Sequence, residues 1–153
     1  MSDDGHSVAG SSGIAWIPLI AAVVALVGLL DSVYLTIHHL TAVPVPCNII
    51  AGCETVLTSQ YAVFSGIPLA AFGAVAYFAA FSLAILAAFG NRTMWKVFGV
   101  LVLLMAAFTL WLIYLQAFVI GAFCQFCLIS AATTFTLLIL FIFSKLAPRQ
   151  RLS

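Results

Sequence analysis

The chain has 153 residues, of which 65% are hydrophobic and only 6% are charged, and its formal net charge is +1. A water-soluble domain needs far more polar residues to cover its surface, so this composition excludes one and indicates a protein dissolved in lipid. The small net charge gives no reason to expect nucleic acid as a partner. Four apolar stretches, at about 14–38, 67–90, 97–121 and 123–144, are each longer than the ~20 residues that cross a bilayer as a helix. We therefore expect an all-α integral membrane protein whose four transmembrane helices form one bundle over residues 14–146.

The first predicted elements are a tail at 1–13 and a helix at 14–38. The tail contains Gly, Ser and acidic residues but no Lys or Arg, unlike the basic start of a signal peptide, so we expect a flexible segment before a retained helix. Asp31 lies about 10 Å inside the outer end of this helix, at ~1.5 Å per residue. An ionisable side chain at that depth is costly and indicates a function. Two roles are open for Asp31, namely a proton relay or a carboxyl group that hydrogen-bonds a neighbouring helix.

A long connection follows at 40–66, where the spacing predicts two short helical turns over 54–61. Pro44 and Pro46 resist helix and lead to Cys47, and Cys53 comes just before the predicted turns. Since the loop is half apolar and half polar, we expect it to lie over the outer mouth of the bundle as a lid rather than to extend into water.

Two of the remaining three helices carry distinctive residues. The helix at 67–90 is rich in Ala and Gly, which predicts a face that neighbouring helices approach closely. The helix at 123–144 begins with Cys124-Gln-Phe-Cys127. Residues three apart share one face of a helix, and the N–H groups at a helix N-terminus stabilise a thiolate. The spacing therefore favours a reactive dithiol, although zinc sites use the same motif.

Basic residues and cysteines are sorted to opposite sides of the predicted membrane. Lys and Arg occur only beside the 67–90/97–121 turn and after 144, at positions 92, 96, 145, 149 and 151. The positive-inside rule makes that side cytoplasmic, together with both termini and a basic tail at 147–153. All four cysteines then lie on the outer face, where an oxidising compartment favours disulfides.

Sequence alone allows three pairings of the four cysteines. Two pairs, one in a loop and one at a helix end, suggest a relay in which the loop pair meets a soluble partner and exchanges with the fixed pair. The competing interpretations are two static disulfides, a zinc site that uses all four thiolates, and unreactive thiols.

The combined pattern resembles the bacterial vitamin K epoxide reductase family. The resemblance covers roughly 14–145 and rests on these elements: Cys47-x5-Cys53-Glu54, Ser59, Tyr61, Gly66-Ile67-Pro68-Leu69, Gly73, Cys124-x-x-Cys127 and the run 30–36. It implies a four-helix bundle around a quinone, with a loop half-helix capping the outer mouth.

The resemblance also implies a role for each site residue. Cys47 would exchange disulfides with a thioredoxin-fold partner, Cys53 would pass electrons to Cys124, and Cys127 would lie nearest the quinone. Ser59 would lie beside the quinone and hydrogen-bond a carbonyl oxygen, with a local turn bond as the alternative.

Two departures from the family are informative. Animal members that reduce the vitamin K epoxide carry an amide and a tyrosine at the positions of Leu69 and Ala131, so the resemblance favours simple quinone reduction here. Many bacterial members carry a fused thioredoxin-like domain, whereas this chain stops at Ser153, so we expect the partner to be a separate protein.

The sequence thus predicts a quinone-dependent thiol oxidoreductase of the bacterial inner membrane that reoxidises an extracytoplasmic, DsbA-like partner. Ubiquinone or menaquinone would accept the electrons and no metal is expected. One alternative is a non-enzymatic membrane assembly factor stapled by disulfides. Another, a transporter, is weakened because Asp31 and Gln116 are the notable polar residues inside the helices.

Overall fold

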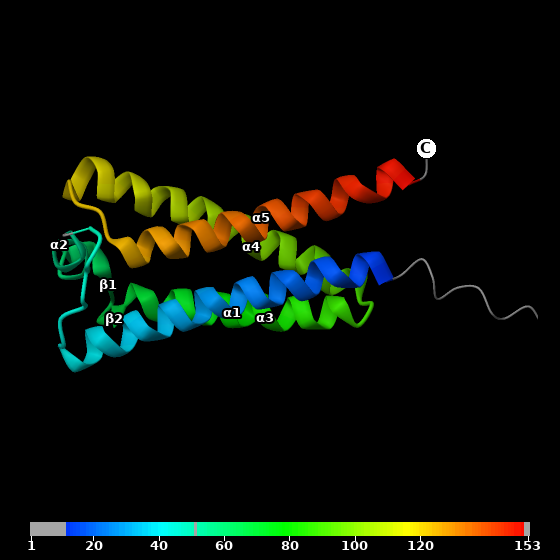
Figure 1. The fold of residues 1–153 in the computed structure, drawn as a ribbon. Coiled ribbons are helices and arrows are strands. Elements are labelled where there is room, and N and C mark those ends of the chain that lie inside the picture. The colour runs from blue at the N-terminus through cyan, green and yellow to red at the C-terminus, as the bar shows by residue number, and fades with distance from the viewer. Residues whose placement is uncertain (1–11, 51, 152–153) are drawn as a thin grey trace, which may run out of the picture.

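Four long helices run side by side in the computed structural model, which describes residues 12–50 and 52–151 (Figure 1). They are α1 (Ser12–Thr41), α3 (Leu69–Ala88), α4 (Arg92–Tyr114) and α5 (Gln125–Arg151), and α4 continues as the π-helix η2 (Leu115–Ile120). Both α1 and α4 pack against α3 and α5, which closes the bundle. Each of the four is long and apolar enough to cross a membrane. The prediction of an all-α, four-helix membrane bundle is therefore confirmed for the described part of the chain.

Several helix ends differ from the predicted boundaries. Helix α1 continues to Thr41 instead of ending at 38. Asp31 therefore lies ten residues, or about 15 Å, inside its outer end, deeper than the sequence suggested. Helix α5 continues to Arg151, so residues 147–151 extend the helix instead of forming a tail. Most of the flexible segment predicted at 1–13, and residues 152–153 of the basic tail, lie outside the described residues.

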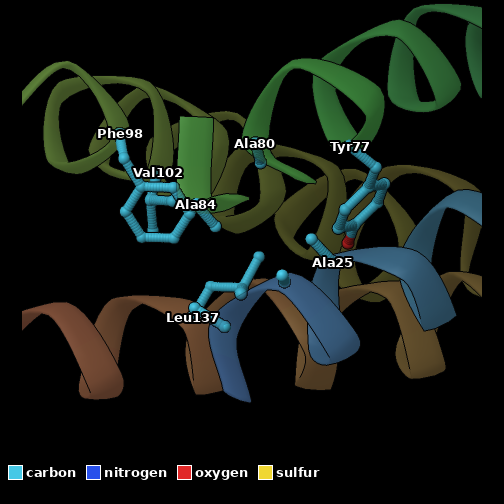
Figure 2. Packing of buried hydrophobic residues seen from close by; sticks show 9 residues of the cluster. Ala25, Tyr77, Ala80, Ala84, Phe98, Val102 and Leu137 are labelled. Atoms are coloured by element: carbon cyan, nitrogen blue, oxygen red, sulfur yellow. The ribbon is translucent and has the colours of Figure 1, made fainter. Parts of the chain in front are cut away.

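Small residues hold the helices together in the core (Figure 2). Ala25 of α1 and Ala80 and Ala84 of α3 are fully buried, which lets these two helices approach closely where water cannot drive their association. The larger core side chains, Tyr77, Phe98, Val102 and Leu137, fill the remaining space. The early small residues of α3, Ala70, Gly73 and Ala76, also line a cavity. The early turns of α3 therefore leave room inside the bundle.

The outer loop folds into short elements over one end of the bundle. Helix α2 (Cys53–Leu57) and the 3-10 turn η1 (Gln60–Ala62) confirm the two predicted helical turns. Strands β1 (Val63–Phe64) and β2 (Ile67–Pro68) then form a hairpin, whose turn residues Ser65 and Gly66 have φ of 55° and 84°. Two consecutive positive φ values are typical of a type I′ turn, which matches the twist of paired strands. Figure 1 places α2 at the end opposite the C-terminus and the α3–α4 turn.

Candidate functional site: two cysteine pairs and a cavity

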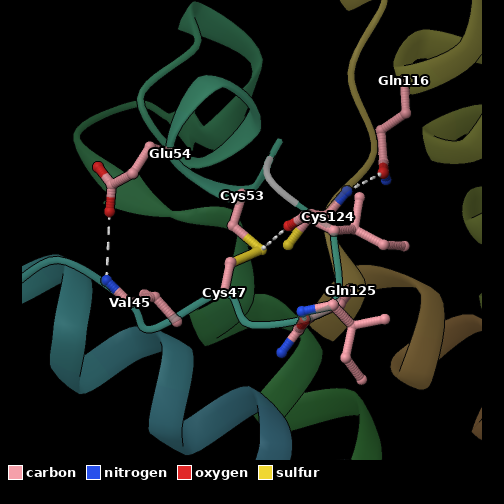
Figure 3. Close-up of a disulfide and its surroundings, with 9 residues drawn as sticks. Val45, Cys47, Cys53, Glu54, Gln116, Cys124 and Gln125 are labelled. Carbon is pink, nitrogen blue, oxygen red and sulfur yellow. Dashed lines mark hydrogen bonds between the residues drawn. A yellow bond between two sulfur atoms is a disulfide. The ribbon is translucent and has the colours of Figure 1, made fainter.

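A disulfide joins the two cysteines of the outer loop. Cys47 and Cys53 are bonded, with their Cα atoms 6.2 Å apart, which selects one of the three pairings left open by the sequence. Cys53 is fully buried at the start of α2, whereas Cys47 is half-buried in the extended segment before it. The carboxylate of Glu54 accepts a hydrogen bond of 3.2 Å from the backbone N–H of Val45. Glu54 therefore fastens the segment that carries Cys47 to α2 (Figure 3).

The second pair is reduced and its first member lies against the disulfide. Cys124 and Cys127 are free thiols. Cys124 is fully buried in one cluster with Cys53 and Val56, and Cys47 packs against the same cluster. Figure 3 shows the Cys124 sulfur next to the Cys53 end of the disulfide. Segments more than 70 residues apart in the chain thus place three sulfur atoms together, as a thiol–disulfide exchange requires.

The start of α5 stabilises a negative charge on Cys124. Cys124 is the residue just before the helix, and its carbonyl accepts the N–H of Leu128 at 3.0 Å. The pKa of its thiol is lowered from 9.0 to about 7, chiefly because the Cys127 thiol donates a hydrogen bond to the Cys124 sulfur. The backbone N–H groups of Cys127 and Phe126 also lower it, while burial and the Asp31 carboxylate oppose the shift. This is the helix N-terminal arrangement that favours a thiolate.

Cys127 faces a different space from Cys124. It lines a cavity of about 710 Å³ enclosed by the four long helices and capped by α2, η1 and the hairpin. Cys124 is absent from the lining of that cavity and belongs to the cluster with the disulfide. The dithiol therefore connects the loop disulfide on one side with the cavity on the other.

The cavity is large and mostly apolar. Its volume falls in the ~300–1,000 Å³ range typical of small-molecule sites. Leu69 and Ala131, the two positions that depart from the epoxide-reducing members, both line it. So do Phe64 and Phe72, whose ring centroids are 6.2 Å apart. An apolar slot of this size, with a thiol in its wall, suits an apolar small molecule that reacts with sulfur.

Ser59 and Asp31 also line the cavity. The Ser59 hydroxyl donates to the carbonyl of Val56 at 2.7 Å, which is the local turn bond considered as the alternative to a quinone contact. For Asp31, the Oδ2 atom is buried and has no hydrogen-bond partner among the described residues. A carboxyl group that joined two helices would have such a partner, so this observation does not support a purely structural role.

Three residues with clear roles in the site had none assigned from the sequence. The Gln116 side chain is 4% exposed, and its Oε1 accepts the N–H of Cys124 at 3.0 Å. The Gln125 Oε1 accepts the N–H of Ile49 at 3.1 Å, which ties the disulfide loop to α5. The Tyr77 hydroxyl bonds Ser130 and Thr134 in the wall of the cavity. A glutamine deep in an apolar helix is the signal that could have indicated the first of these roles.

The described residues contain no group of three or more His, Cys, Asp or Glu that could hold a metal ion. The four cysteines instead form one disulfide and one dithiol. The chemistry available to them is therefore thiol–disulfide exchange and two-electron transfer to a molecule in the cavity.

Fold and site together define a multi-pass membrane protein with a loop disulfide, a helix-end dithiol and an apolar cavity behind it. Comparison with known proteins agrees with this class. The sequence model of the vitamin K epoxide reductase family matches residues 19–142, so the chain belongs to that family. The chain is also 31% identical, over 121 residues, to the "Thiol-disulfide oxidoreductase LTO1" of Arabidopsis thaliana. That match covers 73% of this chain but only 32% of the plant protein, so the chain spans about a third of that relative's length.

Proposed function

We propose that the protein is a quinone-dependent thiol oxidoreductase that reoxidises a thioredoxin-fold partner. The observation that carries the proposal is the position of the dithiol: Cys124 packs against the Cys47–Cys53 disulfide, while Cys127 lines an apolar cavity. Electrons that enter at the disulfide have a direct route through sulfur to a lipid-soluble acceptor.

The first step is an exchange at the loop disulfide. A thiolate of the reduced partner attacks the half-buried Cys47, and Cys53 leaves as a thiolate. The second partner thiol then attacks the mixed disulfide, which releases the oxidised partner and reduced Cys47. Two electrons have now moved to the loop pair.

The second step passes these electrons to the helix-end pair. The Cys53 thiolate attacks Cys124 of an oxidised Cys124–Cys127 pair and displaces the Cys127 thiolate. Cys47 then attacks Cys53, which restores the loop disulfide and leaves Cys124 as a thiolate. The lowered pKa of Cys124 makes it a good leaving group in this step.

In the third step the dithiol gives two electrons to a quinone in the cavity and becomes a disulfide. The structure holds a disulfide at Cys47–Cys53 and free thiols at Cys124 and Cys127, which is the redox state just before this step. Phe64 and Phe72 provide an apolar wall for the ring, and Ser59 offers a polar atom at the same cavity.

The orientation in the membrane belongs to the same proposal. The helix ends with Arg92, Lys96 and Lys145 lie opposite the cysteine loop, and the positive-inside rule assigns that end to the cytoplasm. The cysteine loop then faces the oxidising side of a bacterial inner membrane, where the thioredoxin-fold partner works.

The proposal is tested by mixing the purified protein with a reduced thioredoxin-fold oxidase and a soluble quinone analogue, and following quinone absorbance. We expect Cys124→Ala and Cys127→Ala to abolish quinone reduction. We expect Cys47→Ala and Cys53→Ala to abolish it with the protein partner, but to retain it with a small dithiol that enters the cavity and reduces the pair at Cys127.

Ser82→Ala is a suitable control, because the Ser82 hydroxyl bonds only the carbonyl of Phe78 in its own helix and does not line the cavity. Quinone reduction that survives loss of Cys124 or Cys127 would refute the proposal. Cysteine variants that lose abundance, while the remaining folded protein keeps full activity, would instead support the stapled assembly factor.

A further inference from the structure

Among the described residues, one carboxyl group lines the cavity, and it belongs to Asp31. No Lys or Arg occurs among the residues that line the cavity, and Asp31 Oδ2 is buried without a hydrogen-bond partner among the described residues. An ionisable group at this depth is costly to bury, so an acid with a free oxygen at a substrate cavity points to a role in the reaction.

Asp31 is connected to the outer mouth along one face of α1. Asp31, Leu35 and His39 follow one another at intervals of four residues, and all three line the cavity. His39 lies two residues from the end of α1, under the outer loop, and also lines the smaller cavity of about 260 Å³ beside the loop. The rise from Asp31 to His39 is about 12 Å at ~1.5 Å per residue.

The other titratable groups around the cavity are weaker candidates for a proton donor. They are Tyr77 from α3, Tyr61 from η1, Cys127 from α5 and His39, which lies about 12 Å from Asp31 toward the outer mouth. The Tyr77 hydroxyl is already bonded to Ser130 and Thr134, and Tyr61 belongs to the capping loop. Cys127 is itself one of the electron donors. Asp31 is the acid that remains free to give up a proton.

The proton balance of quinone reduction requires such a group. A quinone takes up two electrons and two protons when it becomes a hydroquinone. With Cys124 as a thiolate and Cys127 as a thiol, formation of the Cys124–Cys127 disulfide releases two electrons but only one proton. The second proton has to come from another acid at the cavity.

We propose that Asp31, in its neutral carboxylic acid form, donates the second proton to the reduced quinone and is reprotonated from the outer mouth along the His39 face of α1. The inference rests on the proposed quinone reduction and deepens it. In the balanced step, the Cys124 thiolate and the Cys127 thiol form a disulfide and give two electrons and one proton to the quinone. The Asp31 carboxylic acid gives the second proton and becomes a carboxylate, and the quinone becomes a hydroquinone. Asp31 then recovers its proton from water at the outer face.

The experiment is a single turnover of the fully reduced protein with a soluble quinone analogue, followed by stopped-flow absorbance. We expect Asp31→Asn to slow quinone reduction by about 10²-fold or more, the usual loss when a general acid is removed. Asp31→Glu should recover most of the rate. The exchange between the partner and Cys47–Cys53 should not change, because Asp31 lines the cavity and neither Cys47 nor Cys53 does.

Two further readouts separate proton donation from a structural role. In the wild type the single-turnover rate should fall as pH rises and Asp31 loses its proton, and Asp31→Asn should lose this alkaline limb. The KM for quinone should stay within twofold. Thr36→Val is the matched control on the same helix, since Thr36 bonds the carbonyl of Ser32 and does not line the cavity.

An Asp31→Asn protein that is as fast as Thr36→Val, or that keeps the alkaline limb, would overturn the inference. A raised KM with unchanged kcat would also overturn it, because it would make Asp31 a binding group. His39→Ala should slow multiple turnovers but not the single turnover, and equal multiple-turnover rates would overturn the His39 route. If the wild type does not reduce quinone at all, the proposed function itself has failed. The wild-type reaction therefore distinguishes failure of the proposed function from failure of the Asp31 inference.

Discussion

Removing the Cys127 thiol should raise the pKa of Cys124 and reduce its thiolate population at neutral pH. The hydrogen bond from Cys127 is the largest cause of the lowered pKa of about 7. At pH 7 a thiol with that pKa is about half ionised, compared with about 1% for a thiol at the ordinary value of 9.0. Because two backbone N–H groups still lower the pKa in Cys127→Ala, we expect a midpoint at least about one unit higher and a thiolate fraction near a tenth or less.

The assay is a pH titration of thiolate absorbance near 240 nm in a Cys47→Ala/Cys53→Ala background, kept reduced. That background removes the neighbouring disulfide, which a lone Cys124 thiolate would otherwise attack. Cys127→Ser is the matched control, because its hydroxyl can still donate to the Cys124 sulfur and should leave the midpoint closer to 7. A midpoint near 9 in the background protein, or the same midpoint in Cys127→Ala, would refute the reasoning.

Four other changes have outcomes that follow from the contacts described. The Cys124 thiolate is present above about pH 7 and is lost as pH falls through that value. In Asp31→Asn, which lacks the opposing titration of Asp31, single-turnover quinone reduction should therefore drop about fivefold from pH 7 to pH 6; a rate that rises over this interval would contradict the assignment. Gln116→Leu leaves the buried N–H of Cys124 unpaired and should cost about 1–3 kcal/mol in unfolding free energy, measured by thermal denaturation in detergent. Tyr77→Phe removes the link between α3 and α5 and should cost about 0.6–2 kcal/mol, whereas no loss would mean that Ser130 and Thr134 satisfy each other. Gly28→Ala would place a methyl group in the Tyr77 ring and should destabilise the bundle by about 1–3 kcal/mol, unless α1 can shift away from α3.

The length and polarity of the spans could be predicted because they depend on local composition. Runs of apolar residues longer than a bilayer is thick identified all four long helices. Their orientation, taken from the sorting of five basic residues, stays a prediction. The short turns of α2 and η1 were predicted for the same reason, since the pattern of residues 54–61 suits helical turns. Helix ends were predicted less well, because hydropathy changes gradually where α1 and α5 leave the membrane.

The sequence by itself also determined which residues could be reactive, because cysteine spacing and a helix N-terminus are local properties. Only the tertiary structure decided what each thiol faces: Cys53 and Cys124 are 71 positions apart, yet they share one buried cluster, while Cys127 lines the cavity. Packing between distant helices likewise decided that Gln116 binds the N–H of Cys124 and that Asp31 keeps a free oxygen. These relations depend on how separate helices associate, and hydropathy cannot encode that association because every helix in lipid is apolar on most of its surface.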